Sequence, residues 1–233
     1  QHCKAPDLSH SLALLEGKVE DIDLESADAK FLLSEAARRI DDRLPGHKIN
    51  YDIDSLLEKI DLANMTEELR KVMLVAIAHV KHANAVNKGD AKESKEIREG
   101  LRYISHSEDP QLLALDLRAE IAETVPSSPA FEKLINKVFA LTGLRASMLQ
   151  MAIIERVDAE VACKLIKRIQ MPDQDSQANL SSSRRVAAII WYWRSQLGTH
   201  NQFSSLAEAI ALWKMAMCPK AASDAAERMH SLL

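Results

Sequence analysis

Aromatic residues, glycine, proline and cysteine are all scarce in this chain. Only 4% of the 233 residues are aromatic, and there are six glycines and seven prolines. So few residues that interrupt helices are typical of a protein built largely from helices. The apolar fraction of 47% is nevertheless ordinary, so the chain has enough apolar side chain to form a real core.

The three cysteines, Cys3, Cys163 and Cys218, are odd in number and widely spaced. They form no C-x-x-C pair, which argues against a structural zinc site and against a disulfide framework. This usage favours a reducing compartment, either the cytoplasm or a host cytosol into which the protein is exported. Since no apolar stretch approaches the roughly 20 residues of a membrane-spanning helix, we also expect no membrane span.

An excess of basic charge is lacking too. The net charge is −4 and the isoelectric point about 6.1. Nucleic-acid binders usually carry a basic patch or a high isoelectric point, so we expect no nucleic-acid partner. Acidic charge is concentrated early, because residues 1–62 contain 14 Asp and Glu against 8 Lys and Arg. We therefore expect an acidic N-terminal segment, residues 1–25, followed by a helical domain, residues 26–233.

Helix start signals follow one another closely from residue 26 onward. Asp90 with Glu93 has the spacing of a capping box, and Ser128 stands before a proline at an expected first helical position. No segment shows the sustained alternation of a strand bounded by turns. The sequence therefore predicts an all-α protein, an irregular multi-helix bundle of about nine or ten helices, with two stacked sub-bundles as a further possibility.

Two segments, residues 72–78 and 148–169, are apolar on more than one side and are expected to form buried central helices. If each is the centre of a sub-bundle, the boundary falls near 105–110 or in the polar connector 172–183. The last helix is expected to begin at Ser223, after a break at Pro219.

The motifs of common enzymes and cofactor sites are missing. The chain contains no P-loop, no dinucleotide-binding fingerprint, no G-x-S-x-G and no H-E-x-x-H. His79 and His82 lie three residues apart, but no acidic residue falls at a matching helical step beside them. We therefore expect no cofactor and no metal, and the sequence argues against an enzyme.

Two tryptophans and a tyrosine stand side by side in SSSRRVAAIIWYWRSQLG, residues 181–198. On a helical wheel Val186, Ile190, Trp193 and Leu197 form one core-facing stripe, whereas Trp191 points roughly 120° away from it. Three interpretations are open. The helix lies between two layers of its own fold, or Trp191 belongs to a contact surface, or Trp191 lines a ligand pocket.

Aromatic residues accompanied by arginine are typical of interface hot spots. The candidate partner-binding residues are Trp191, Tyr192, Arg184, Arg185 and Arg194. They favour a non-enzymatic protein-interaction module, such as a regulator, an adaptor or a secreted effector domain, with a protein partner. A structural domain that self-associates as a homo-oligomer is an alternative. Ser181, Ser182 and Ser183 are expected to form the N-cap region of this helix.

A short segment around Arg145 suggests a different activity. TGLRASMLQMA, residues 142–152, resembles the arginine-finger segment of bacterial effector GTPase-activating domains, which are four-helix bundles, and QLGTHNQ, residues 196–202, keeps part of a second element of that family. The departures are that the first glycine lies one position too close to the arginine, that Leu197 replaces a tryptophan, and that a glycine pair is absent. The resemblance implies that Arg145 stabilises charge on a transferring phosphoryl group.

Overall fold

The computed structural model describes residues 28–47, 51–103, 110–172 and 180–232, and all the regular structure in them is helical. These residues form eleven helices, one or two more than the sequence predicts. The helices are α2 (Ala29–Asp41), α3 (Ile53–Glu58), α4 (Glu67–Lys88), α5 (Ala91–Arg102), α6 (Pro110–Glu123), α7 (Pro129–Phe139), α8 (Leu144–Ile154), α9 (Ala159–Ile166), α10 (Leu180–Gln196), α11 (Gln202–Met215) and α12 (Pro219–His230).

Short polar side chains begin most of these helices. Asp90 accepts a hydrogen bond from the Glu93 backbone N–H over 2.9 Å, and Ser128 caps α7 in the same way ahead of Pro129. Such caps satisfy N–H groups that have no partner within the first turn. Both caps lie where the sequence predicts them.

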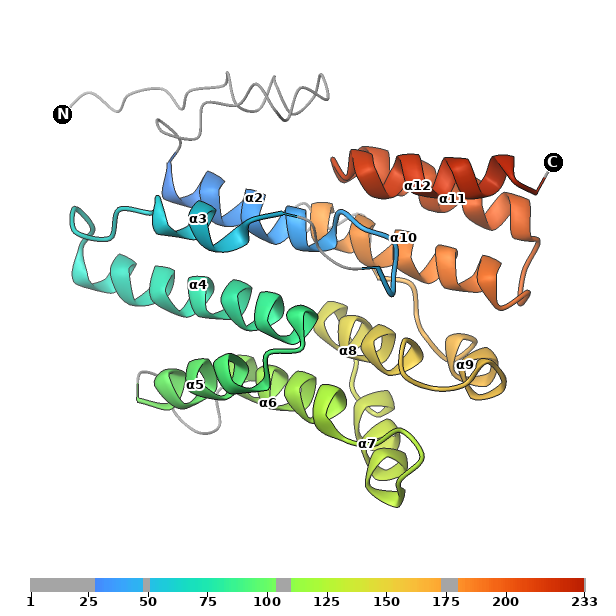
Figure 1. The fold of residues 1–233 in the computed structure, drawn as a ribbon, viewed down its shortest axis with the longest axis horizontal. Coiled ribbons are helices and arrows are strands. Elements are labelled where there is room, and N and C mark those ends of the chain that lie inside the picture. Colours follow the sequence, from blue (N-terminus) through green and yellow to red (C-terminus); the bar gives the residue numbers. More distant parts are fainter. Residues whose placement is uncertain (1–27, 48–50, 104–109, 173–179, 233) are drawn as a thin grey trace.

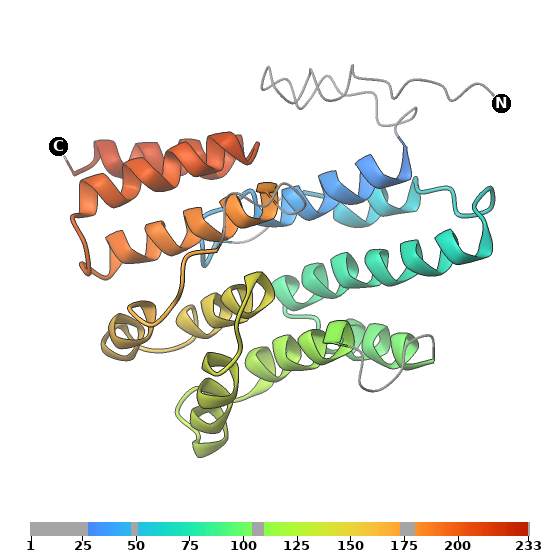
Figure 2. The ribbon, with the colours of Figure 1, turned by 180° about the vertical axis from the view of Figure 1, so that it is seen from behind.

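The helices are arranged in two halves that Figures 1 and 2 show from opposite sides. In one half α4 lies between α2 and α3 on one side and α5 and α6 on the other. In the other half α10 packs against α11 on one side and against α8 and α9 on the other, and α12 packs on α11.

Buried apolar side chains form three large clusters and one small one. One large cluster unites α2, α3 and α4, a second unites α6 to α10, and a third unites α10, α11 and α12. The small cluster joins α5 to the start of α6. Val186 and Ile190 of α10 belong to the second cluster, whereas Ala187, Ala188 and Tyr192 belong to the third. The helix with the aromatic residues is therefore packed between two layers of its own fold.

The expected continuous helix over residues 148–169 is wrong, because the chain breaks between α8 and α9. Asp158 has an extended backbone and accepts a hydrogen bond from the Val161 N–H over 2.9 Å. This cap starts a new helix in a new direction, and the apolar residues that cover more than one side of 148–169 thus belong to two helices.

The expectation that residues 72–78 are buried on every side is also wrong. Met73 is buried, but Val72 is 63% exposed and Leu74 is 37% exposed. The first turns of α4 are largely exposed, and the buried residues of this helix lie mostly in its second half, from Val80 to Ala85.

The last helix begins at Pro219 and not at Ser223. Pro219 both ends the preceding segment and occupies the first turn of α12, where a missing N–H costs nothing. The side chain of Asp42 accepts the N–H of Ala221 over 2.9 Å, so the start of α12 is capped by a residue far away in the sequence.

Some expectations concern residues outside those described. They are the acidic segment 1–25 and most of the two boundaries, 105–110 and 172–183. In the described part of the chain, every helix is too short or too polar to cross a lipid bilayer.

Candidate functional site: an arginine-lined cavity

A cavity of about 550 Å³ opens near the middle of the molecule. Its walls come from the end of α2 and the turn after it, from α4, α6 and α8, and from the first half of α10. In Figures 1 and 2 these segments meet where the two halves of the molecule join. Small-molecule sites commonly have this size. The larger apolar lining residues are Leu115, Ile121, Met148, Met151, Val186 and Ile189.

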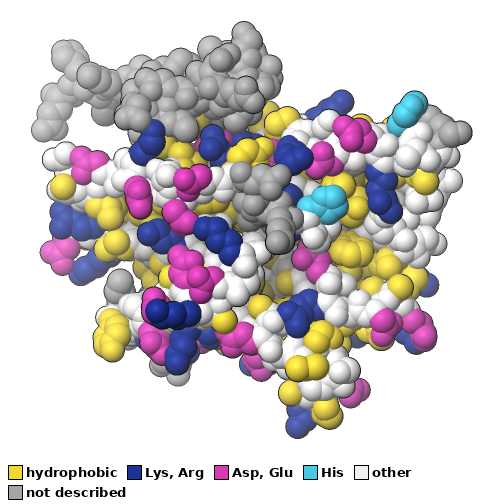
Figure 3. All heavy atoms as spheres, viewed as in Figure 1, with side chains coloured by type: hydrophobic (Ala, Val, Ile, Leu, Met, Phe, Trp, Pro, Cys, Tyr) yellow, Lys and Arg dark blue, Asp and Glu magenta, His cyan; other side chains and the backbone are white. Residues whose placement is uncertain are grey.

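Arginine dominates the charged lining. The charged residues of the wall are Arg43, Arg118, Arg145, Arg156, Arg185, Asp41 and Glu155. Five cations against two carboxylates leave an excess of three positive charges, in a chain whose net charge is −4. On the face drawn in Figure 3, by contrast, basic and acidic side chains are interspersed. A concave wall with one dominant sign of charge concentrates ions of the opposite sign, so the cavity suits an anion.

Arg185 has its hydrogen bonds filled by the protein. Its Nε donates to Asp41 Oδ2 over 2.9 Å, and its two terminal nitrogens donate to the hydroxyls of Ser181 and Ser182 over 3.0 and 3.1 Å. The serines thus lie within the first turn of α10, which begins at Leu180, and not before it as expected. Arg185 thus links the start of α10 to the end of α2 through an ion pair with Asp41.

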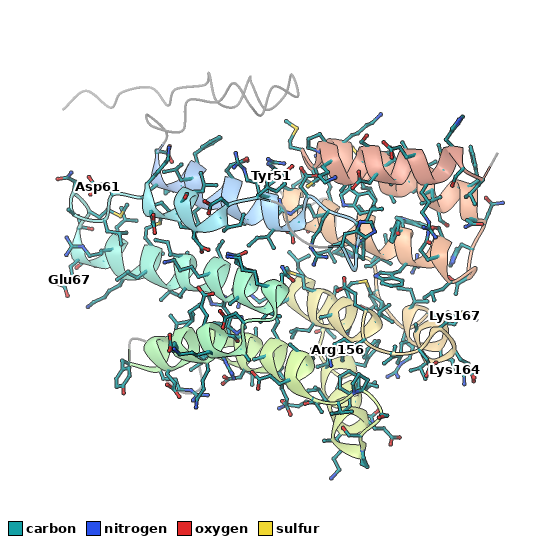
Figure 4. All side chains as sticks on the ribbon, in the orientation of Figure 1. Tyr51, Asp61, Glu67, Arg156, Lys164 and Lys167 are labelled. Atoms are coloured by element: carbon teal, nitrogen blue, oxygen red, sulfur yellow. The ribbon has the colours of Figure 1, made fainter. Side chains whose placement is uncertain are left out.

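Arg156 also holds the fold together. It follows α8 and donates hydrogen bonds to the carbonyl oxygens of Ala122 and Thr124 at the end of α6. Figure 4 labels it at the junction of α8 with α6 and α7. Carbonyls of a last helical turn have no partner within the helix, and Arg156 supplies two of them with donors. Its charge contributes to the cavity, but its donors are occupied.

Arg43 and Asn87 bring donors without acceptors. Arg43 donates to the His47 carbonyl over 2.7 Å and to the Asn87 side-chain oxygen over 3.3 Å. The Nε of Arg43 and the Nδ2 of Asn87 are buried, and neither has a hydrogen-bond partner among the described residues. Buried donors in folded proteins nearly always have an acceptor. Both atoms are shielded from the cavity in this conformation, so their side chains would have to turn for an acceptor in the cavity to complete both groups.

Arg118 of α6 and Arg145 of α8 are the two least constrained cations of the wall. Within the described residues neither forms a hydrogen bond or an ion pair. Burial lowers the pKa of Arg118, and the charges of Asp41 and Glu155 oppose that effect only in part. Since an arginine stays protonated in proteins, Arg118 is a desolvated cation without a direct counter-ion.

Glu155 is the second acid of the wall, and its charge acts on Arg118 less strongly than the charge of Asp41. Its side chain is accessible from the cavity and yet surrounded by protein. This environment raises the pKa of Glu155, while Arg43 and Arg118 act to lower it. Glu155 forms no ion pair with either arginine within the described residues, so the two charge types face each other without direct contact.

The aromatic residues of α10 lie away from the cavity lining. Tyr192 is buried with only 5% of its surface exposed, and Trp193 packs against the cluster of α6 to α10. Trp191 is partly buried, with the Arg194 guanidinium 4.9 Å from its ring centre and the His200 ring edge-on at 5.6 Å. Cation–π contacts of this kind stabilise by about 0.5–1 kcal/mol at exposed sites.

Of the six candidate site residues from the sequence, the cavity brings together Arg145 and Arg185. Trp191, Tyr192 and Arg194 lie further along α10, and Arg184 points towards the end of α11, where its nearest acceptor is the Met215 carbonyl at 3.5 Å. The segment 196–202, which carries the second part of the resemblance to GTPase-activating domains, contributes nothing to the cavity wall.

Sequence reasoning missed Arg43, Arg118, Glu155 and Asn87. The one available signal was Arg118, the single cation in the run LLALDLRAEIA, which is apolar apart from Arg118, Asp116 and Glu120. A charged residue inside such a run must find a partner or line a cavity. The other three stand at helix ends, where charge is ordinary.

Comparison with protein-family models, with curated proteins and with solved structures finds no match to this chain. In the described part of the chain, no three His, Cys, Asp or Glu side chains are grouped as metal ligands would be. The functional proposal therefore depends on the geometry and the charge of the cavity.

Proposed function

We propose that the protein binds a small amphipathic anion in the arginine-lined cavity. The observation that carries this proposal is the pair of cations Arg118 and Arg145, which belong to different helices and have no hydrogen bond or ion pair within the described residues. Arg118 is desolvated, and a desolvated cation without a partner is costly. An anionic group between α6 and α8 would offset that cost and accept hydrogen bonds from both guanidinium groups.

The apolar part of the ligand is proposed from the rest of the wall. Leucine, isoleucine, valine and two methionines line the same space as the arginines. Apolar surface removed from water contributes roughly 25 cal/mol per Å², and methionine adapts readily to the shape of a ligand. A ligand that joins an anionic group to an apolar body would use both kinds of lining.

The test is calorimetric titration of the full chain with octanoate, octyl sulfate, octyl phosphate and neutral octanol. At least one of the anions is expected to bind more tightly than octanol by tenfold or more. Arg145→Gln should weaken that binding by about tenfold, the loss of one charge-assisted interaction of ~1.4 kcal/mol. Equal affinity for octanol, or no binding of any of the four compounds, would contradict the proposal.

Protein binding through α10 is a second proposed function. What favours it is Trp191, which is half-buried and has the Arg194 guanidinium 4.9 Å from its ring centre. Tryptophan and arginine dominate the energetics of many interfaces. The same surface would serve a protein partner or a second copy of the chain.

Measurement of molar mass as a function of concentration tests self-association. Trp191→Ala should remove any increase in mass with concentration, and affinity capture with both forms tests for a different partner. A mass that is constant for the wild type, together with capture profiles that Trp191→Ala leaves unchanged, would contradict this second proposal.

The arginine-finger reading of Arg145 stays a third proposal. A finger has to reach the nucleotide of a partner, whereas Arg145 lines a cavity of its own chain. The geometry therefore favours ligand binding. Faster GTP hydrolysis by a small GTPase in the presence of the wild type, lost with Arg145→Gln, would support the finger instead.

A further inference from the structure

We infer that the anionic group bound in the cavity is a phosphate monoester, held by Arg43, Arg118 and Arg145 together with the Asn87 amide. This inference rests on the proposed anion-binding function and specifies its ligand. Three features of the wall favour a phosphate monoester: its net charge, its number of unused hydrogen-bond donors, and the positions of these donors on different elements.

Charge balance favours a dianion. The wall carries an excess of three positive charges, counted from five arginines and two carboxylates. A carboxylate or a sulfate ester has a single negative charge and would leave two of the three uncompensated. A phosphate monoester carries about −1.5 to −2 at neutral pH, so it would come closer to neutralising the site.

The unused donors favour an acceptor with three terminal oxygens. Arg118 and Arg145 have all their N–H groups available, and Arg43 Nε and Asn87 Nδ2 are buried without partners in the described part of the chain. A carboxylate presents two oxygens, whereas a phosphate monoester presents three strong acceptors. The planar guanidinium can also bind two phosphate oxygens side by side.

The donors come from four places in the chain. Arg43 lies in the turn after α2, Asn87 near the end of α4, Arg118 in α6 and Arg145 in the first turn of α8. A tetrahedral group can accept hydrogen bonds from several directions at once, whereas the oxygens of a planar carboxylate lie in a single plane. The arrangement of donors on several elements around one space thus suits the tetrahedral group.

Arg185 and Arg156 are excluded from direct binding. Their nitrogens already donate to Asp41 and two serines, and to the carbonyls of α6, respectively. They act on the ligand through charge alone. Variants of these two arginines would change the fold as well as the affinity, so they are unsuitable for the test.

The experiment compares three probes of equal chain length by calorimetric titration of the full chain at pH 7.5. Octyl phosphate is mostly dianionic there, because the second pKa of a phosphate ester lies near 6. Octyl sulfate is tetrahedral with one charge, and octanoate is planar with one charge. We expect octyl phosphate to bind at least tenfold more tightly than either, which separates charge from shape.

The variants Arg118→Gln and Arg145→Gln identify the site. Each should weaken octyl phosphate binding by tenfold or more and reduce its preference over octanoate. Arg228→Gln is the matched control, since Arg228 is an exposed arginine of α12 outside the cavity wall. It should leave the affinity unchanged. Arg145 is itself exposed, so its variant keeps the test valid even if Arg118→Gln changes the melting temperature.

The outcomes separate this inference from the proposed function. If octanoate and octyl sulfate bind as tightly as octyl phosphate, the phosphate assignment fails and anion binding stands. If octyl phosphate binds but both arginine variants bind it equally well, the assigned residues are wrong. If no probe binds, the inference and the proposed function fail together.

Phosphate monoesters occur both as soluble metabolites and as lipid headgroups. Sedimentation with phosphatidylcholine vesicles, with and without phosphatidic acid, distinguishes these sources. Binding that depends on phosphatidic acid and is displaced by octyl phosphate supports a lipid source. An absence of vesicle binding, together with tight octyl phosphate binding, supports a soluble ester.

Discussion

His82 shows how one buried side chain makes the stability of this protein depend on pH. It lies fully buried in α4, and its Nε2 is 3.1 Å from the Ser94 hydroxyl of α5. Burial above all, and then the charges of Arg118 and Arg98, lower the pKa of His82 to about 4. The imidazole is therefore neutral in the folded protein at neutral pH.

The consequence is a loss of stability on acidification. An unfolded histidine takes up a proton near pH 6.5, whereas folded His82 does so only near pH 4. Between these values the unfolded chain binds more protons, so stability falls as the pH falls. The gap corresponds to roughly 3 kcal/mol at most. The free energy of unfolding, measured with urea, should depend less on pH between 6.5 and 4 for His82→Gln than for the wild type. His230→Gln, which changes an exposed histidine, should leave this pH dependence as it is. The same pH dependence for the wild type and His82→Gln would refute the assignment.

Glu155 is expected to weaken the binding of an anion. Its carboxylate faces the same cavity as Arg43 and Arg118, and burial raises its pKa against the effect of these two cations. A bound anion would raise that pKa further, because like charges repel. Glu155→Gln should therefore tighten octyl phosphate binding at pH 8 by roughly one order of magnitude.

The pH dependence of this difference provides the check. The advantage of Glu155→Gln should shrink as the pH is lowered, because the wild-type carboxyl then takes up a proton and loses its charge. Titration of the ligand itself is the same for both proteins and cancels in the ratio of dissociation constants. Weaker binding by the variant would mean that Glu155 contacts the ligand as an acceptor.

At the scale of elements, the start of α12 depends on a carboxylate from the end of α2. Asp42 is 1% exposed and accepts the Ala221 N–H over 2.9 Å and the Arg38 Nη1 over 3.1 Å. Arg38 in turn donates to the Met217 carbonyl over 2.7 Å. Met217 has a left-handed backbone, with φ of 59°, a conformation that a non-glycine residue adopts at a cost. These contacts from α2 hold the turn in place.

Asp42→Ala should destabilise the protein by about 2 kcal/mol, because it leaves the Ala221 N–H without its acceptor and removes one of the ion pairs of the buried Arg38. Asp224→Ala is the matched control in α12, where Asp224 pairs with Lys220 near the surface over 3.1 Å. Its loss should cost less than 1 kcal/mol. Urea unfolding of both variants measures the difference. Equal losses would mean that Asp42 does not anchor α12.

The sequence predicts the helices better than their ends. Asp90 and Ser128 were predictable caps because the capping bond is local, because Glu93 follows Asp90 at the capping-box spacing, and because a proline directly follows Ser128. The cap before α4 is Thr66, where the sequence also offers Asn64, and the cap before α11 is Asn201, where it also offers Ser205. Several short polar residues can supply the same bond, and packing decides between them.

The cavity could not be predicted in the same way. Its unused donors come from residues 43, 87, 118 and 145, which no local pattern connects. Arg145 was a candidate because of a motif resemblance, and Arg185 was a candidate because tryptophan and tyrosine residues follow it closely in the sequence. The two arginines line one cavity because α8 and α10 pack near α4 and α6. A single sequence does not show which helices pack against one another.

At the scale of the whole molecule, the cavity is lined by residues from more than one apolar cluster. Leu115 belongs to the small cluster of α5 and α6, whereas Leu149, Met151 and Val186 belong to the cluster of α6 to α10. The turn after α2 supplies Arg43, and the next residue, Leu44, belongs to the cluster of α10, α11 and α12. A ligand in this space would therefore contact elements that belong to different clusters.

Amide hydrogen exchange should reveal this linkage. A ligand that binds the folded state raises the free energy of every opening that breaks its site. Octyl phosphate is thus expected to slow exchange in the turn after α2, in α6 and in the first turns of α8, and to affect α11 and α12 least, since neither lines the cavity. With Arg145→Gln the slowing should be lost in all three segments together. Protection confined to α11 and α12 would place the ligand elsewhere, and protection of α8 alone would mean that the cavity does not couple the two halves.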